Sequence, residues 1–286
     1  MIRALITLYK PDAYVVENVK TIIPQVDEIY LSDNSPENNK SIFDGLEKIR
    51  YRFNNGNLAL SGAFNRILED DSIGWNDDDY VVFFDQDSTI KPEHIKKLIK
   101  RFDILSCHNI KVGCLGPIYF NRSTNALAIP KIKKQISRYD YIVKSIITSS
   151  MLSKYKILKS VGFWNESVFL DMADWDLCWR IREKGWECIE TKASVLDHAV
   201  GSGVVKAGKI NISRTSQIRE YYQARNYLYL LHKKYVPIKY KIEFIQNLTI
   251  RPIFHYFYLD NGKKRMQYIR EGIRDYKKGY FGEYRG

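Results

Sequence analysis

Residues 80–88 read Tyr-Val-Val-Phe-Phe-Asp-Gln-Asp-Ser, an apolar run that ends abruptly in two carboxylates. The apolar half predicts a buried strand over Tyr80–Phe84. The carboxylates of Asp85 and Asp87 then emerge where this strand reaches solvent, and charges at such a position need compensation. A divalent cation bound by the carboxylate oxygens would provide this compensation. The alternative is a structural role, because isolated acidic pairs also cap helices and occur in turns.

The segments around this run alternate between short β-rich runs and helical patterns. This alternation predicts an α/β fold with a mostly parallel central sheet flanked by helices. The expected strands are Arg3–Tyr9, Glu28–Ser32, Arg50–Phe53, Tyr80–Phe84, Val112–Phe120, Tyr141–Ser149 and Glu187–Leu196. The expected helices are Tyr14–Ile23, Lys40–Lys48, Ser61–Leu68, Pro92 to about Leu105, Trp175–Lys184, Ile218–Tyr235, Ile242–Tyr258 and Lys263–Lys278.

Composition narrows the class of protein. With 45% hydrophobic and 27% charged residues in 286, the chain is typical of a folded globular protein and not of a disordered one. The four cysteines lack the spacing of a zinc knuckle, and we expect reduced thiols. The apolar run Ala4–Tyr9 is too short for a signal peptide or a membrane span, which predicts a cytoplasmic location.

Positive charge is concentrated in the C-terminal region. The formal net charge is +12, and residues 233–286 hold thirteen Lys/Arg against five Asp/Glu together with many aromatic residues. Such a segment suits anionic lipid, nucleic acid or a phosphate-bearing substrate. A solvated helical face over a small aromatic core is the alternative.

Polar residues follow each strand of the first half, and two more clusters come later. In an open α/β sheet the ligand crevice lies beyond the carboxyl ends of the strands. Asp171, Asp174 and Asp176 lie at the start of the helix expected at Trp175–Lys184, where acidic residues are helix-dipole partners or suit a general base. His198 ends a strand. A lone histidine is more often structural than a ligand, but a neutral imidazole beside two carboxylates can complete a divalent-metal site.

In this order the elements resemble the inverting GT-A glycosyltransferases of family 2, especially the rhamnosyltransferase-like members. The resemblance covers residues 1 to about 235. Its motifs are Thr7-Leu8-Tyr9-Lys10-Pro11, Asp33-Asn34-Ser35, Asn57-Leu58-Ala59 with Asn65, Phe84-Asp85-Gln86-Asp87-Ser88, Gly162-Phe163 with Glu166, Phe169-Leu170-Asp171 with Asp174, His198 with Gly201, and Tyr221-Tyr222 with Arg225-Asn226.

The resemblance implies roles for these residues. It implies that a nucleotide-sugar donor is bound by Thr7, Tyr9, Asp33, Asn57, Asp85, Gln86 and Asp87, and that Asp85, Asp87 and His198 hold Mn²⁺ or Mg²⁺. Asp174 is the expected catalytic base, and Asp171, Trp175 and Asp176 the expected acceptor-binding residues. The expected organisation is a GT-A catalytic domain over 1–212, with a nucleotide-sugar half to about 120 and an acceptor half from 121, followed by a helical region over 213–286.

The Phe-Asp-Gln-Asp-Ser run, with Asp171 three residues before Asp174, is similar to members that use dTDP-L-rhamnose. UDP-galactofuranose and UDP-hexoses stay open as donors, because rhamnosyl members often have Glu where this chain has Asp176. The run Gln223-Ala224-Arg225-Asn226 departs from the Gln-x-x-Arg-Trp of processive relatives, so we expect one or few additions per encounter.

The resemblance also implies partners. The expected acceptor is a lipid-linked intermediate of a bacterial surface polysaccharide or cell-wall glycan. The basic tail would then touch the anionic inner face of the plasma membrane as a peripheral contact, and the sequence leaves a homodimer open.

Two other classes of function fit less well. The stretch Gly203–Ile210 is close to the phosphate-binding loop motif of NTPases, but Ile210 replaces the required Ser/Thr. In a GT-A enzyme this stretch suits a mobile loop over the donor diphosphate. The basic charge suits a nucleic-acid-binding protein, yet the acidic clusters argue against it, and we expect no nucleic-acid partner.

Overall fold

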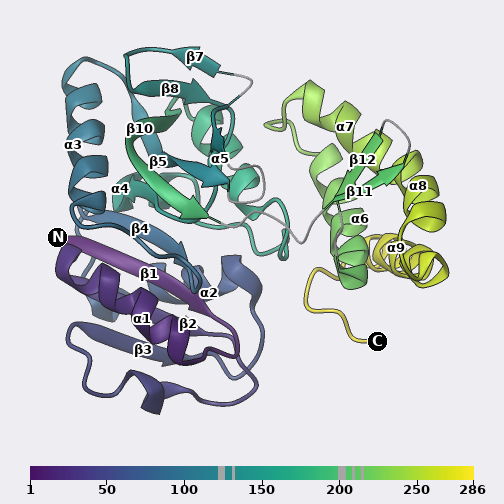
Figure 1. Cartoon of the computed structure of the whole chain (residues 1–286), viewed down its shortest axis with the longest axis horizontal. Helices are drawn as coiled ribbons and strands as arrows, with labels where there is room; N and C mark the ends of the chain where they lie inside the picture. Colours follow the sequence, from purple (N-terminus) through teal and green to yellow (C-terminus); the bar gives the residue numbers. More distant parts are fainter. Residues whose placement is uncertain (122–125, 131–132, 199–203, 208–209, 214–215) are drawn as a thin grey trace.

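The computed structural model describes residues 1–286 apart from 122–125, 131–132, 199–203, 208–209 and 214–215. For strand residues that border these gaps, including Asp197 and His198, only the backbone is described. Figure 1 shows the sheet and its helices on one side of the molecule and the C-terminal helices α6–α9 on the other.

Strands and helices alternate through the first half. The elements are β1 (Ile2–Leu8), α1 (Ala13–Ile22), η1 (Ile23–Gln25), β2 (Glu28–Asp33), η2 (Lys40–Phe43), β3 (Ile49–Phe53), α2 (Ala59–Leu68), η3 (Asp71–Ile73), β4 (Tyr80–Asp85), α3 (His94–Cys107), β5 (Val112–Asn121), β6 (Ala126–Ala128), β7 (Lys133–Gln135), β8 (Asp140–Val143), β9 (Met151–Lys154), α4 (Tyr155–Ser160), α5 (Ala173–Glu183), β10 (Glu187–His198), β11 (Val204–Ala207), β12 (Ile210–Ser213), α6 (Gln217–Leu231), α7 (Ile238–Thr249), α8 (Arg251–Tyr258) and α9 (Gly262–Lys277).

The central sheet has a parallel half and a mixed half. Within the described residues its strand order is β3-β2-β1-β4-β9-β5-β10-β8-β7, with β6 added to β5. Strands β3, β2, β1 and β4 are parallel, β9 is antiparallel to both of its neighbours, and β5 and β10 are parallel. The expected α/β fold with a parallel core flanked by helices is therefore confirmed.

The apolar run of β4 forms the centre of the core. Val81 to Phe84 are all 0% exposed, because β4 lies between β1 and β9 with helices on both faces. The ring of Phe83 packs against Phe64 of α2 and Trp164, with centroids 4.7 and 5.0 Å away. This packing fixes where β4 ends, and so where Asp85 emerges.

Three helical expectations need correction. The helix expected over Lys40–Lys48 is a single 3-10 turn, Lys40–Phe43, because the chain becomes extended at Asp44 and then turns at Gly45, whose φ is +82°. Helix α3 begins at His94 rather than Pro92, after Glu93 in the left-handed region. The helix expected over Ile242–Tyr258 begins four residues earlier and is divided into α7 and α8, since Pro252 has no N–H to continue the α7 ladder.

One expected strand is also shorter than its pattern. The stretch Tyr141–Ser149 contributes only β8, Asp140–Val143, and the chain then turns into β9. At this turn Ser150 has φ +67°, and its N–H donates to the carbonyl of Phe83. The turn places the preceding residue, Ser149, beside Asp85.

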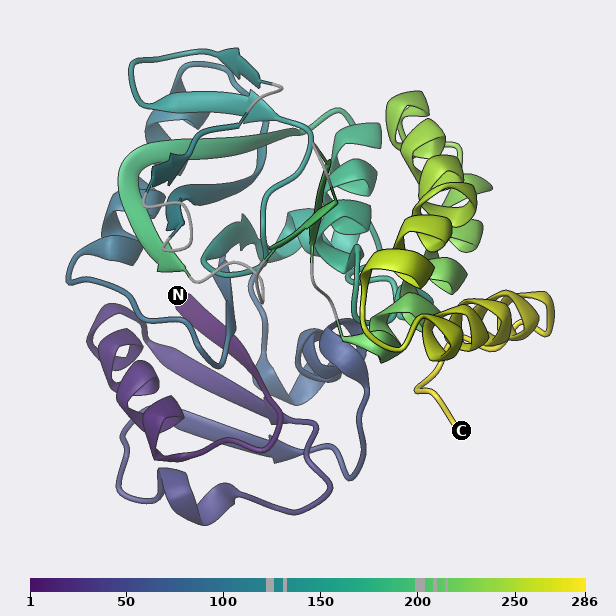
Figure 2. The same ribbon diagram turned by 45° about the vertical axis from the view of Figure 1, so that its right-hand side comes forward.

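The C-terminal helices pack on one another and on the loop before α5. Figures 1 and 2 both show α6–α9 gathered at one end of the molecule, away from β1–β3. Tyr222 of α6 stacks on Phe169, with centroids 4.9 Å apart. In the described part of the chain no helix has both the length and the apolar character needed to cross a membrane.

Candidate active site

The parallel register brings polar residues of three strands to one edge of the sheet. Thr7 of β1 pairs with Ser32 of β2 on one side and with Asp85 of β4 on the other. Leu8 is in register with Asp33. The structure therefore brings the predicted donor residues Thr7, Asp33 and Asp85 to the carboxyl edge of the sheet. We call this edge, together with Asp87, the acidic rim.

Asp33 is fully buried and held by donors from its own neighbourhood. Its carboxylate accepts hydrogen bonds from the backbone N–H of Ser35 at 2.9 Å, from Asn39 at 3.0 Å, and from the hydroxyls of Ser35 and Tyr51. Burial raises the pKa of this carboxyl, but these hydrogen bonds outweigh it and hold the pKa below its usual value. Asp33 is thus an oriented anion at neutral pH.

Gln86 joins the acidic turn to the loop after β1. Its side-chain oxygen accepts from the N–H of Tyr9 at 2.8 Å, and its amide donates to the carbonyl of Tyr9 at 3.2 Å. Asn18 of α1 donates to the carbonyl of Gln86 at 3.0 Å. Tyr9 is 45% exposed beside this rim, with the Lys10 ammonium 5.5 Å from the centre of its ring, and such a ring can stack on a planar ligand.

Asp85 and Asp87 lie on one tight turn. Asp85 accepts a hydrogen bond from the hydroxyl of Ser149 and has further interactions, and Asp87 is exposed two residues on. Carboxylate oxygens are the hard ligands that Mg²⁺ and Mn²⁺ prefer, so this pair fits such an ion. His198 ends β10, where its backbone pairs with Asn121 of β5, and its side chain lies outside the described part of the chain.

Asp174 lies in the first turn of α5 and is electrostatically linked to this rim. Burial is the main cause that raises its pKa to about 8, and the nearby Cys178 and the carboxylates of Asp85 and Asp171 raise it further. A hydrogen bond of 2.9 Å from the N–H of Trp175 offsets part of the effect. A carboxyl that ionises near neutral pH is suited to take a proton from a substrate.

The backbone before α5 follows a sharply bent path. Leu170 and Met172 both adopt left-handed conformations, with φ of +69° and +72°. Residues of this kind seldom take such conformations unless the surroundings hold them there. The contacts of Asp171 provide that support.

Asp171 is tied to helix α6. Its carboxylate forms a two-pronged ion pair with Arg219 and accepts from Gln223 at 3.0 Å. Asn226 donates to the backbone carbonyls of Phe169 and Asp171 at 2.8 and 2.9 Å. Arg219, Gln223 and Asn226 are spaced so that they share one face of the helix, but this spacing does not show what the face contacts.

The side chains of Trp175 and Asp176 have partners within the protein. Trp175 packs edge-to-face on Trp179 and on Tyr240 of α7. Asp176 is 0% exposed, accepts from Arg180 at 2.7 Å and Asn165 at 3.1 Å, and also accepts from the hydroxyl of Tyr235. An acceptor could reach Asp176 only by displacing these partners.

Asn57 connects the rim to the C-terminus. Its side-chain oxygen accepts from the N–H of Ala59, and its amide donates to Glu283 at 2.9 Å. Tyr284 follows, and its N–H donates to the hydroxyl of Tyr222 at 3.0 Å. The last residues of the chain thus touch one of the predicted donor residues, and no motif in the sequence signalled this contact.

A cluster of thiols lies behind Asp174. The sulfur atoms of Cys114, Cys178 and Cys188 lie within 4.8 Å of one another, and all three side chains are buried and free. Cys178 is one helical turn after Asp174. The three cysteines are separated in sequence, so the sequence did not reveal the cluster. The pairing of β5 with β10 and the packing of α5 bring them together.

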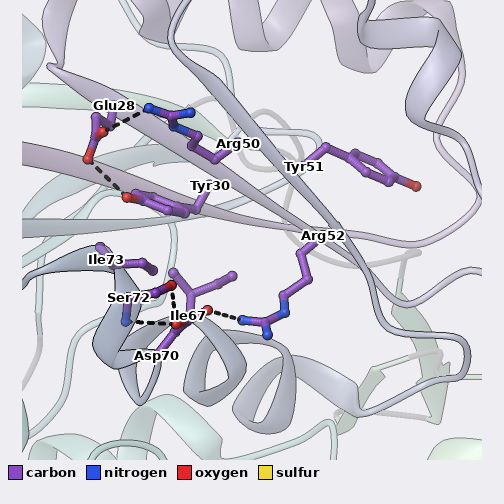
Figure 3. A pocket seen from close by; sticks show the side chains of 9 residues that line it. All are labelled: Glu28, Tyr30, Arg50, Tyr51, Arg52, Ile67, Asp70, Ser72 and Ile73. Carbon is purple, nitrogen blue, oxygen red and sulfur yellow. Dashed lines mark hydrogen bonds and ion pairs between the residues drawn. The ribbon is translucent and has the colours of Figure 1, made fainter.

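A separate recess of about 480 Å³ lies beside β2 and β3 (Figure 3). Alternation along β3 sends Arg50 and Arg52 toward it, whereas the Tyr51 side chain points away from them and bonds to Asp33. Arg52 pairs with Asp70 at 2.8 Å, so positive charge in the recess is compensated. Tyr51 links the recess to Asp33, but the carboxylates of Asp85 and Asp87 do not line it.

Comparisons with known proteins converge on one family. The family model described as Glycosyl transferase family 2 matches residues 4–161. The dTDP-rhamnosyl transferase RfbF of Shigella flexneri is 31% identical over 206 residues, which are 68% of this chain and 66% of that protein. The chain thus spans just under two thirds of that relative's length.

Solved structures share the fold at low sequence identity. A crystal structure of GalNAc-T7 with UDP, GalNAc and Mn²⁺ matches with a TM-score of 0.56 and 9% identity, covering 98% of this chain and 58% of that one. Residues 1–349 of S. aureus TarS in complex with UDP-GlcNAc match with a TM-score of 0.54 and 13% identity, covering 99% and 93%. These similarities support the GT-A fold.

Proposed function

The chain belongs to glycosyltransferase family 2, and on that premise we propose that it moves L-rhamnose from dTDP-L-rhamnose to an acceptor hydroxyl with inversion. The observation that carries the proposal is the meeting of Asp174, whose pKa is raised to about 8, with the carboxylate rim at the end of β4. A proton acceptor would thus lie within electrostatic reach of an anionic turn suited to a metal–diphosphate, the combination that this reaction requires.

In the proposed reaction Asp174 removes the proton of the acceptor hydroxyl. The oxygen attacks the anomeric carbon on the face opposite the nucleoside diphosphate, the glycosidic bond forms as the bond to the diphosphate breaks, and the configuration inverts. Asp85 and Asp87, with His198, would hold Mn²⁺ or Mg²⁺, which neutralises charge on the departing diphosphate. The proton ends on Asp174 and leaves to solvent.

The remaining rim residues would bind the nucleotide. Thr7 and the ionised Asp33 lie near the carboxyl ends of the neighbouring strands β1 and β2, one register position apart, and the exposed Tyr9 offers a surface for the base. Gln86 would act by fixing the Tyr9 backbone. The amide of Asn57 would bind the donor after its hydrogen bond to Glu283 is broken. In this proposal Asp171 and Asp176 position the start of α5, and Trp175 bounds the acceptor side.

The similarity to a dTDP-rhamnosyl transferase supports rhamnose as the sugar. UDP-galactofuranose and UDP-hexoses are the competing donors. The proposed acceptor is a lipid-linked intermediate of a surface polysaccharide, met at the cytoplasmic face of the membrane.

Ligand-dependent thermal unfolding tests the donor. The full chain is heated with dTDP-rhamnose, UDP-galactofuranose, UDP-glucose or UDP-galactose, each with Mn²⁺ and again with EDTA. A ligand present at about 100 times its Kd stabilises the native state by about 2.7 kcal/mol. We expect the largest increase in Tm with dTDP-rhamnose and Mn²⁺; a larger increase with a UDP-sugar would contradict the rhamnosyl assignment.

A further inference from the structure

Helix α7 has one face turned to the catalytic domain. Its Tyr240 packs on Trp175 and Trp179 of α5, with centroids 5.1 and 5.0 Å away. Phe244, one turn later, is 0% exposed and packs on Trp179 and on Tyr227 of α6. These contacts fix α7 against the helix that carries Asp174.

The opposite side of α7 and α8 is an apolar ridge. We define this ridge as Ile238, Ile242, Ile245, Ile250, Ile253 and Phe257, each more than half exposed. In α7 the isoleucines recur at intervals of four and three residues, so they share one helical face. Single exposed apolar residues are ordinary on a protein surface, but six on two successive helices are typical of an interaction surface.

A groove opens beside this ridge between α8 and α9. It has a volume of about 550 Å³ and is lined by Ile253, Tyr256, Phe257, Lys263, Met266 and Arg270. Its walls are thus apolar and aromatic, with two cations from α9. This combination suits a hydrocarbon chain with an anionic head group.

The net positive charge of residues 238–278, which carry the ridge, favours an anionic partner over a second copy of this chain. Residues 238–278 contain ten Lys/Arg and four Asp/Glu. Two copies of this chain joined through the ridge would bring like charges together, which opposes self-association. An anionic bilayer attracts the same charges and accepts the apolar side chains.

We propose that the apolar ridge lies in the surface of an anionic phospholipid bilayer and that the groove between α8 and α9 holds a phospholipid, with its phosphate at Lys263 and Arg270. The contact is peripheral, because α7 and α8 lie along the surface rather than across it. Its benefit to catalysis rests on the proposed function: α7 then holds α5 and Asp174 close to a membrane-anchored acceptor.

Cosedimentation with vesicles tests the proposal on the full chain. The vesicles are phosphatidylcholine, alone or with about 30% phosphatidylglycerol. One variant carries Ile242→Ser, Ile253→Ser and Phe257→Ser, and a second carries Lys263→Gln and Arg270→Gln. The matched controls are Leu127→Ser with Ile129→Ser, exposed apolar residues elsewhere, and Lys91→Gln with Lys184→Gln, exposed lysines elsewhere.

We expect the wild type and both controls to bind the anionic vesicles, and each test variant to bind them at least about tenfold more weakly. Equal binding by wild type and test variants would overturn the proposal, and so would absence of binding by the wild type. If instead the isoleucine variant turned a dimer into a monomer in light scattering, the ridge would be a self-association face. Donor binding measured on the same samples separates failure of this proposal from failure of the proposed function.

Discussion

The carboxylate of Asp85, at the end of β4, lies close enough to Asp174, in the first turn of α5, to raise its pKa. The two residues are far apart in sequence, and one ends a strand whereas the other begins a helix. Burial alone would already favour the protonated form of Asp174, and the charge of Asp85 adds to it. The base therefore becomes competent near neutral pH rather than near pH 4.

This relationship predicts the pH dependence of transfer. Asp174 must be ionised to accept a proton, and its pKa of about 8 in the free protein means that the ionised fraction grows as pH rises toward 8. We expect kcat/KM to rise between about pH 6 and 8, at a donor concentration well below saturation. A profile that is flat over this range would show that Asp174 does not limit the reaction.

The same pKa predicts a stability effect of Asp174→Asn. The carboxyl has a raised pKa in the native state and an ordinary one in the unfolded state, so ionisation favours unfolding between about pH 4 and 8. The asparagine of the variant does not ionise, so the variant does not lose stability in this way as the pH rises. We expect its Tm to exceed that of the wild type by at least about 2 °C at pH 8 and by little at pH 4.5.

Glu183→Gln is the matched control, since Glu183 is exposed at the other end of the same helix. It should leave the Tm unchanged at both pH values. An Asp174→Asn variant that is less stable than the wild type at pH 8 would contradict the assigned environment.

The ion pair between Asp171 and Arg219 predicts a coupled loss of stability. Arg219→Gln leaves the buried carboxylate of Asp171 without its cation, and we expect a cost of about 1–3 kcal/mol in the free energy of unfolding. Asp171→Asn in the same background should recover part of it. A double-mutant cycle in urea measures this coupling, and an interaction energy near zero would contradict a supporting role for the pair.

Asp176 gives a prediction that separates support from substrate contact. Asp176→Asn weakens the hydrogen bonds to Arg180 and Tyr235 inside the protein, with an expected cost of about 1–3 kcal/mol. The variant that remains folded should keep the KM for the acceptor within about twofold. A large increase in that KM, at unchanged stability, would support direct contact with the acceptor.

Much of the rim could be predicted from the sequence, because the end of a buried strand is marked by the change from apolar to polar residues. The run before Asp85 and the positions of Thr7 and Asp33 follow from strand periodicity and from the rule that parallel strands share a carboxyl edge. The sequence did not show that the stretch Tyr141–Ser149 contributes only Asp140–Val143, or that the chain then turns at Ser150, whose φ is +67°.

The missed residues depend on tertiary contacts. Arg219 and Gln223 carry no local signal of a partner on the loop before α5, and Glu283 reaches Asn57 over most of the chain's length. Asp176 looks like its neighbours Asp171 and Asp174 in sequence, yet the helix turns it toward Asn165 and Tyr235. The direction of a side chain in the first turn of a helix depends on the residue at which the helix begins, and a sequence motif does not determine that residue.

Transfer by Asp174→Asn, measured beside calorimetric donor binding with Mn²⁺, tests the central assignment most directly. Asn keeps the shape of Asp but cannot take the proton, so we expect turnover to fall by at least about 10²-fold while the donor Kd stays within about threefold. Near-native turnover by a variant that binds donor normally would contradict the role of Asp174 as the base.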